Sequence, residues 1–92
     1  MLSFTPIDLS KVKKEDKNKE ILRLGIIAEL DAVSLYEQLA AVTDNNDIKK
    51  VLLDIAKEEK THVGEFQALL LQKDKEQLKE LKKGEEEVKS FN

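Results

Sequence analysis

The stretch IKKVLLDIAKEEKTHVGEFQAL, residues 48–69, decides the fold. Its positions 48, 52, 55, 59, 62, 66 and 69 follow one another at alternating spacings of four and three, as on the packed face of a bundle helix. Five of these positions are apolar, and the other two are Glu59 and His62. The pattern predicts a long helix over residues 47–72 whose packed face carries an acid and an imidazole.

A similar packed face is predicted in the residues that precede this helix. Apolar residues recur at helical spacing without a proline and predict a first helix over residues 14–43. Glu29 and Tyr36 occupy positions at which this pattern predicts aliphatic residues. On another side of the same helix, Ile27 and Leu30 lie among polar residues, which indicates contacts beyond a two-helix hairpin.

The turn and the chain ends complete the predicted organisation. The sequence TDNND at residues 43–47 is typical of a tight connection, in which we expect Asp47 to cap the second helix. A connection this short places the two helices side by side and antiparallel. Asp74 and Gln77 have capping-box spacing and predict a short third helix over residues 75–83 that ends at Gly84. The whole of residues 1–92 is then a single all-α domain, with an N-terminal tail at 1–13 and a tail or linker at 85–92.

The size and charge of the chain exclude several classes of function. A chain of 92 residues without cysteine has no disulfides to supplement its small core, so a metal or a partner chain is expected to stabilise it. The net charge of −3 offers no basic field for nucleic acid. No apolar run is long enough to span a membrane and no secretion signal is visible, so we expect a cytoplasmic protein.

The acids within the apolar faces require a compensating cation, because desolvated carboxylates are costly and neither face contains Lys or Arg. Glu59 and His62 form a Glu-x-x-His pair on one side of a helix. Glu29 lies 16 residues before Asn45 and Glu59 lies 14 after it, so the hairpin brings them to the same height. Together they are half of a di-iron carboxylate site, which a second copy would complete as a homodimeric four-helix bundle. The alternative is a histidine that pairs with nearby acids without metal.

The segments ILRLGIIAELDAVSLYEQLA (21–40) and VLLDIAKEEKTHVGEFQALLL (51–71) resemble the encapsulated ferritins, ferritin-like cargo proteins of encapsulin nanocompartments. The resemblance implies a ferroxidase that oxidises Fe(II) for storage inside an encapsulin shell, with two Fe per dimer. It implies that Glu29, Glu59 and His62 ligate iron at a dimer interface and that Tyr36 stands close to it. It also implies a ring of dimers, commonly a decamer, and a shell protein that is either separate or fused to this domain.

Departures from the family pattern affect secondary metal sites. Positions 28 and 35 are alanine and leucine where relatives can carry an acid and an aromatic residue, and Asp31 is the acid that represents the entry to the site. Glu58 shares a stripe of its helix with charged residues, so we expect it to face solvent or to lie on an entry path for iron. Asp31 and Glu58 are thus the candidate entry or secondary metal ligands. The segment GEEEVKSFN, residues 84–92, lacks the pattern of a shell-targeting peptide, so the chain resembles versions fused in front of a shell protein. Three alternative functions stay open: a rubrerythrin-like peroxidase, an iron-binding chaperone and a metal-free assembly domain.

Overall fold

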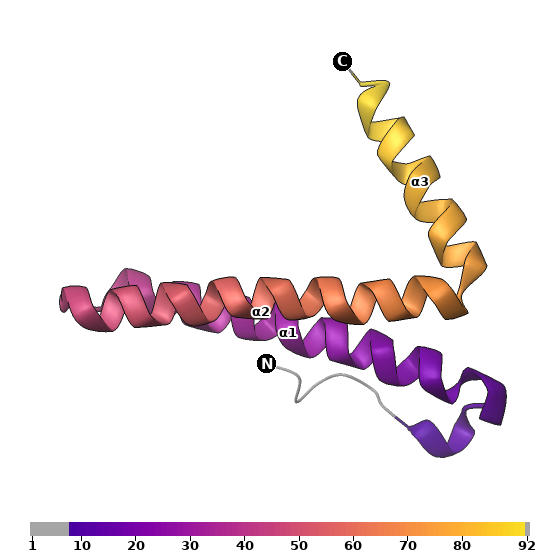
Figure 1. Ribbon diagram of the computed structural model, residues 1–92, viewed down its shortest axis with the longest axis horizontal. Helices are drawn as coiled ribbons and strands as arrows, with labels where there is room; N and C mark the ends of the chain where they lie inside the picture. Colours follow the sequence, from indigo (N-terminus) through magenta and orange to yellow (C-terminus); the bar gives the residue numbers. More distant parts are fainter. Residues whose placement is uncertain (1–7, 92) are drawn as a thin grey trace.

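A computed structural model describes residues 8–91 of the chain. Throughout this range the regular structure is helical, as the sequence predicts. Figure 1 shows two long antiparallel helices side by side and a third that leaves the end of the second at a steep angle. The elements are the short 3-10 turns η2 (Leu9–Lys11) and η3 (Lys14–Asp16), followed by α1 (Lys17–Val42), α2 (Asn46–Lys73) and α3 (Lys75–Lys89).

The core lies between α1 and α2 and consists of small and medium side chains. In α1 the buried residues are Leu22, Val33 and Ala40, which confirms the predicted packed face of this helix. In α2 the buried apolar residues are Ala56 and Leu70. No large side chain in residues 8–91 is completely enclosed. One chain therefore encloses only a small core of its own.

The shape of the chain leads to the same conclusion. Its radius of gyration is 16.5 Å, whereas a compact domain of this length has a radius of about 12 Å. It exposes 7351 Å² of surface, whereas a compact monomer of this mass exposes about 5,400 Å². No helix within residues 8–91 is both long and apolar enough to cross a membrane.

The cap of α2 differs from the prediction. Asn45, rather than Asp47, is the N-cap, and its Oδ1 accepts hydrogen bonds from the backbone N–H groups of Asp47 and Ile48, both at 3.0 Å. The helix starts at Asn46, so Asp47 lies inside its first turn. A negative charge there still favours the helix through the macrodipole. At the other end of the hairpin, the predicted start at residue 14 is a 3-10 turn, and α1 begins only at Lys17.

The predicted end of the third helix was wrong. α3 continues through Gly84 to Lys89, so residues 85–89 are helical and not a tail or linker. Gly84 does not adopt the left-handed conformation by which a glycine ends a helix. The segment after it is rich in good helix formers, and Lys89 pairs with Glu85 at 3.2 Å across one turn. Of the predicted N-terminal tail, residues 8–13 include the turn η2, and residues 1–7 lie outside the described part of the chain.

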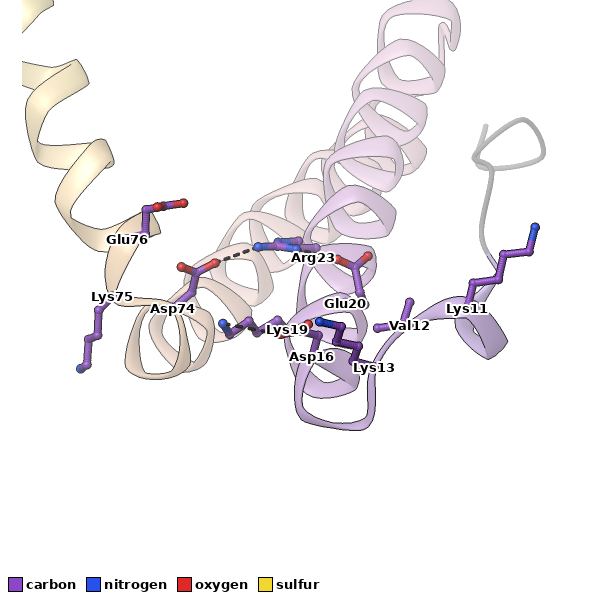
Figure 2. Close-up of a pocket in the computed structure, with 10 residues that line it drawn as sticks. All are labelled: Lys11, Val12, Lys13, Asp16, Lys19, Glu20, Arg23, Asp74, Lys75 and Glu76. Atoms are coloured by element: carbon purple, nitrogen blue, oxygen red, sulfur yellow. Dashed lines mark hydrogen bonds and ion pairs between the residues drawn. The ribbon is translucent and has the colours of Figure 1, made fainter.

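Asp74 fixes the elbow between α2 and α3. Its Oδ1 accepts the backbone N–H of Gln77 at 3.0 Å, as expected for the N-cap of α3. Its Oδ2 accepts a 2.8 Å hydrogen bond from Nη2 of Arg23 in α1, and Arg23 also pairs with Glu20 (Figure 2). The Gln77 N–H and the Arg23 guanidinium lower the pKa of the Asp74 carboxyl. This network ties the base of α3 to the start of α1.

Candidate metal centre

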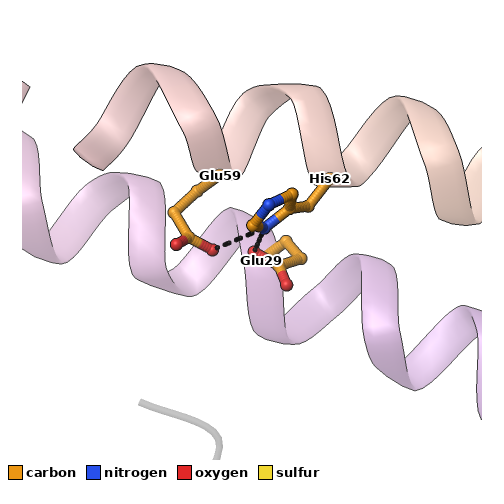
Figure 3. A group of neighbouring side chains, drawn as sticks. All are labelled: Glu29, Glu59 and His62. Atoms are coloured by element: carbon orange, nitrogen blue, oxygen red, sulfur yellow. Dashed lines mark hydrogen bonds and ion pairs between the residues drawn. The ribbon is translucent and has the colours of Figure 1, made fainter. Parts of the chain in front are cut away.

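Glu29, Glu59 and His62 meet between the two long helices. Glu29 comes from α1, and Glu59 and His62 come from adjacent turns of α2 (Figure 3). His62 Nδ1 lies 3.3 Å from Glu29 Oε2 and 3.4 Å from Glu59 Oε2. One potential ligand atom from each residue lies within 4.8 Å of the others. The structure thus brings together the three residues that the sequence places at one height of the hairpin.

The surroundings of these three side chains suit a cation. All three are half-buried, with 19% of the Glu29 side chain and 20% of the Glu59 side chain exposed. Across residues 8–91, His62 is the only basic side chain within ion-pair distance of either carboxylate. Two carboxylates and one imidazole, with no thiolate, form a donor set that suits iron or manganese. The residues present therefore fit an iron ion.

A small cavity of about 290 Å³ opens beside this group. Glu29 and His62 form one part of its wall, and Phe66, Leu69 and Glu65 from the following turns of α2 form the rest. Phe66 and Leu69 were expected on the packed face of α2, but their position beside the metal-binding group was not. Their i+4 and i+7 spacing from His62 is the signal in the sequence that places them there.

The other predicted site residues lie further away. Tyr36 is half-buried two turns after Glu29, about 10 Å along the axis of α1, and is not one of the three residues that meet. Asp31 is half-buried and Glu58 is exposed, and neither joins this group. The exposure of Glu58 agrees with its expected position on the solvent side. The roles of these three residues stay predictions.

Comparison with known proteins identifies the family. The rubrerythrin family matches residues 20–91. A solved structure, the encapsulated ferritin domain from Pyrococcus furiosus, superposes with a TM-score of 0.84 at 52% identity and covers 100% of this chain and 94% of its own. The chain belongs to the rubrerythrin family and, within it, to the encapsulated ferritins. The resemblance inferred from residues 21–40 and 51–71 is confirmed, as is the ferritin-like helical fold.

Two curated relatives of this encapsulated ferritin are longer proteins. A ferritin-like-encapsulin shell fusion protein from Pyrococcus furiosus is 56% identical over 93 residues, which cover 99% of this chain and 27% of the fusion protein. The encapsulin nanocompartment cargo protein EncC from Myxococcus xanthus is 38% identical over 68 residues, which cover 74% of this chain and 52% of the cargo protein. The chain thus spans about a quarter and about half of the lengths of these relatives.

Proposed function

We propose that this encapsulated ferritin is a ferroxidase that oxidises Fe(II) with dioxygen at a di-iron site shared by two subunits. The observation that carries the proposal is the convergence of Glu29, Glu59 and His62 from two helices in a half-buried position that has no Lys or Arg partner among residues 8–91. Such a position is unfavourable for two carboxylates unless a cation neutralises them. Fe(II), the substrate, supplies that charge.

The site needs a second copy of the chain. Di-iron bundles use a Glu from each of two helices and a Glu-x-x-His from each of the other two. One hairpin holds one of each, and a two-fold axis beside the site would supply the rest. In this arrangement Glu59 and its symmetry mate would hold the two irons jointly, and Glu29 and His62 of each subunit would complete the set of ligands.

Exposed apolar residues beside the site support such a dimer. Val51 and Leu69 lie on the stripe of α2 that contains His62, eleven residues before it and seven after it. They are 58% and 47% exposed in the single chain. Leu69 also lines the cavity that Glu29 and His62 share. A partner seated on this stripe would bury these side chains and exclude water from the metal ligands.

A second apolar groove supports assembly beyond the dimer. It lies in the angle between the hairpin and α3, has a volume of about 320 Å³, and is lined mainly by Ile26, Ile27, Leu70, Leu71 and Leu81. Ile27 and Leu81 are each 42% exposed. Two apolar contact regions on one protomer allow each dimer to join two neighbours. This is the requirement for the ring, a decamer on the family pattern, that we propose.

In the proposed reaction the chain binds Fe(II), orients it and holds it out of bulk water. Two Fe(II) ions each lose one electron, and together they reduce one dioxygen molecule, which takes up two protons and leaves as hydrogen peroxide. Carboxylates suit this change because they adjust their coordination as the charge of the metal rises. We propose that Tyr36, two turns away on the same face of α1, influences electron transfer and does not ligate the ions.

The relatives suggest where this reaction takes place. One is named as a fusion to an encapsulin shell and another as a cargo protein of an encapsulin nanocompartment. We therefore place this domain inside an encapsulin nanocompartment, with the shell protein, fused or separate, as its partner. The shell would receive the ferric product, because a ring of small helical subunits encloses no storage volume of its own.

Comparison of oxidants tests the proposal against the rubrerythrin-like alternative. Protein loaded anaerobically with Fe(II) is mixed either with dioxygen or with hydrogen peroxide, and the ferric absorbance is followed by stopped flow. A ferroxidase reacts at once with dioxygen and releases about one peroxide for every two irons. Rapid oxidation by peroxide alone would favour a peroxidase. Binding of Fe(II) without oxidation would favour an iron chaperone, and absence of binding would leave a metal-free assembly domain.

A further inference from the structure

Phe66 lies flat on Gly25, one helical turn from the metal-binding group. A Cβ atom added to Gly25 would lie 3.1 Å from each of three ring atoms of Phe66, namely Cδ1, Cδ2 and Cε1. Ordinary contacts between carbon atoms are longer, about 3.5–4.0 Å. The ring therefore lies directly over Gly25, and a Cβ atom at this position would require the ring to shift by a few tenths of an ångström.

The small space beside Phe66, rather than backbone conformation, explains why position 25 is a glycine. Gly25 lies in the interior of α1, where alanine is the better helix former, and no glycine in residues 8–91 has a positive φ. The other two glycines of the chain also lie within helices, but Cβ atoms on Gly64 and Gly84 would meet nothing within 4 Å. Among the three glycines, only Gly25 is thus in close contact with a side chain of another helix.

The contact is aligned with the metal ligands on both helices. Gly25 comes four residues before Glu29, and Phe66 comes four residues after His62, so each pair lies on one face of its helix. The Gly25–Phe66 contact and the Glu29–His62 contact are therefore successive contacts across the same groove. Phe66 also borders the 290 Å³ cavity that Glu29 and His62 line. A displaced ring finds open space there, beside the two ligands.

We propose that the stacking of Phe66 on Gly25 sets the separation and register of α1 and α2 at the metal-binding group. Gly25 and Phe66 are then positioning residues, which hold the His62 imidazole at the height of Glu29. A side chain at position 25 would shift Phe66 toward the adjacent cavity and disturb the position of His62 at the height of Glu29. This inference rests on the proposed function, because the geometry matters only if these residues bind metal.

Alanine at the three glycines tests the proposal. Gly25→Ala is compared with Gly64→Ala and Gly84→Ala as matched controls, and with the double variant Gly25→Ala/Phe66→Leu, in which the smaller side chain restores space. Each protein is assayed for anaerobic Fe(II) affinity and for thermal stability without metal. The His62 ring resonances are also recorded by NMR in the metal-free protein. We expect Gly25→Ala to weaken Fe(II) binding by more than the roughly twofold variation allowed for the controls, and to move the His62 resonances, because His62 lies one turn from the shifted ring.

The controls should keep affinities within about twofold of wild type, and the double variant should recover most of the loss. Unchanged affinity in Gly25→Ala, equal losses at Gly64 and Gly84, or no recovery in the double variant would each overturn the proposal. The two proposals fail separately. If wild-type protein binds no Fe(II), the proposed function is wrong, and the His62 resonances of Gly25→Ala still decide whether the contact sets the position of His62.

Discussion

Glu59→Gln should make the metal-free protein more stable and the metal-treated protein less stable than wild type. The substitution keeps the size of the side chain and removes one of two carboxylate charges that lie within 4.8 Å of each other. At an effective dielectric constant near 20, two like charges at that distance repel by about 3.5 kcal/mol. The side chains are partly exposed and His62 offsets some of the repulsion, so we expect a net gain of about 1 kcal/mol, or about 4–8 °C in Tm.

Fe(II) should reverse this order of stability between wild type and Glu59→Gln. A metal ion at about one hundred times its dissociation constant stabilises wild type by about 2.7 kcal/mol, and the variant that cannot bind it gains nothing. The assay is thermal unfolding at one fixed protein concentration, with chelator and with anaerobic Fe(II). Glu58→Gln is the matched control, because Glu58 is exposed and outside the group. An Fe(II)-induced rise in Tm that survives in Glu59→Gln and disappears in Glu58→Gln would refute the assignment of the ligands.

Three further substitutions test other parts of the account. Asp74→Asn should lower Tm at neutral pH. The folded pKa of Asp74 lies below its ordinary value of 3.8, so the full difference in Tm between wild type and variant is expected above pH 3.8. This difference should vanish as the pH falls through the folded pKa, which a series of melts in acid buffers would show. Leu69→Lys should leave the helical content of the chain unchanged but prevent dimer formation and reduce Fe(II) affinity, as measured by sedimentation and titration, because Leu69 is 47% exposed on the face that we propose a partner subunit covers. Tyr36→Phe should bind Fe(II) as wild type does and oxidise it more slowly in stopped flow, because Tyr36 is outside the ligand group.

Much of the hairpin and its metal-binding group follows from residue spacing. The alternating spacings of four and three fix which side of each helix is packed, and the turn near Asn45 then fixes which heights meet. Glu29, Glu59 and His62 could therefore be brought together before any coordinates were known, and the structure confirms their proximity. Such spacing is informative because the period of an α-helix is constant over many turns.

Details that depend on competing local interactions were harder to predict. Asn45 and Asp47 are both good caps, and their order of preference depends on where the turn closes. Gly84 was expected to end α3, but the helix-forming residues after it outweigh the cost of one glycine. The stacking of Phe66 on Gly25 depends on the distance between two helices, which residue periodicity does not specify.

Native mass spectrometry during an anaerobic Fe(II) titration tests the central claim most directly, because it reports oligomeric state and bound iron in the same species. The account predicts that metal-stripped protein associates as iron is added, and that iron appears in pairs, two per dimer or per pair of subunits in a larger ring. Glu29→Gln should abolish both effects. Iron bound singly to monomers, or a dimer that forms equally well in the presence of chelator and never binds iron, would contradict the shared di-iron site.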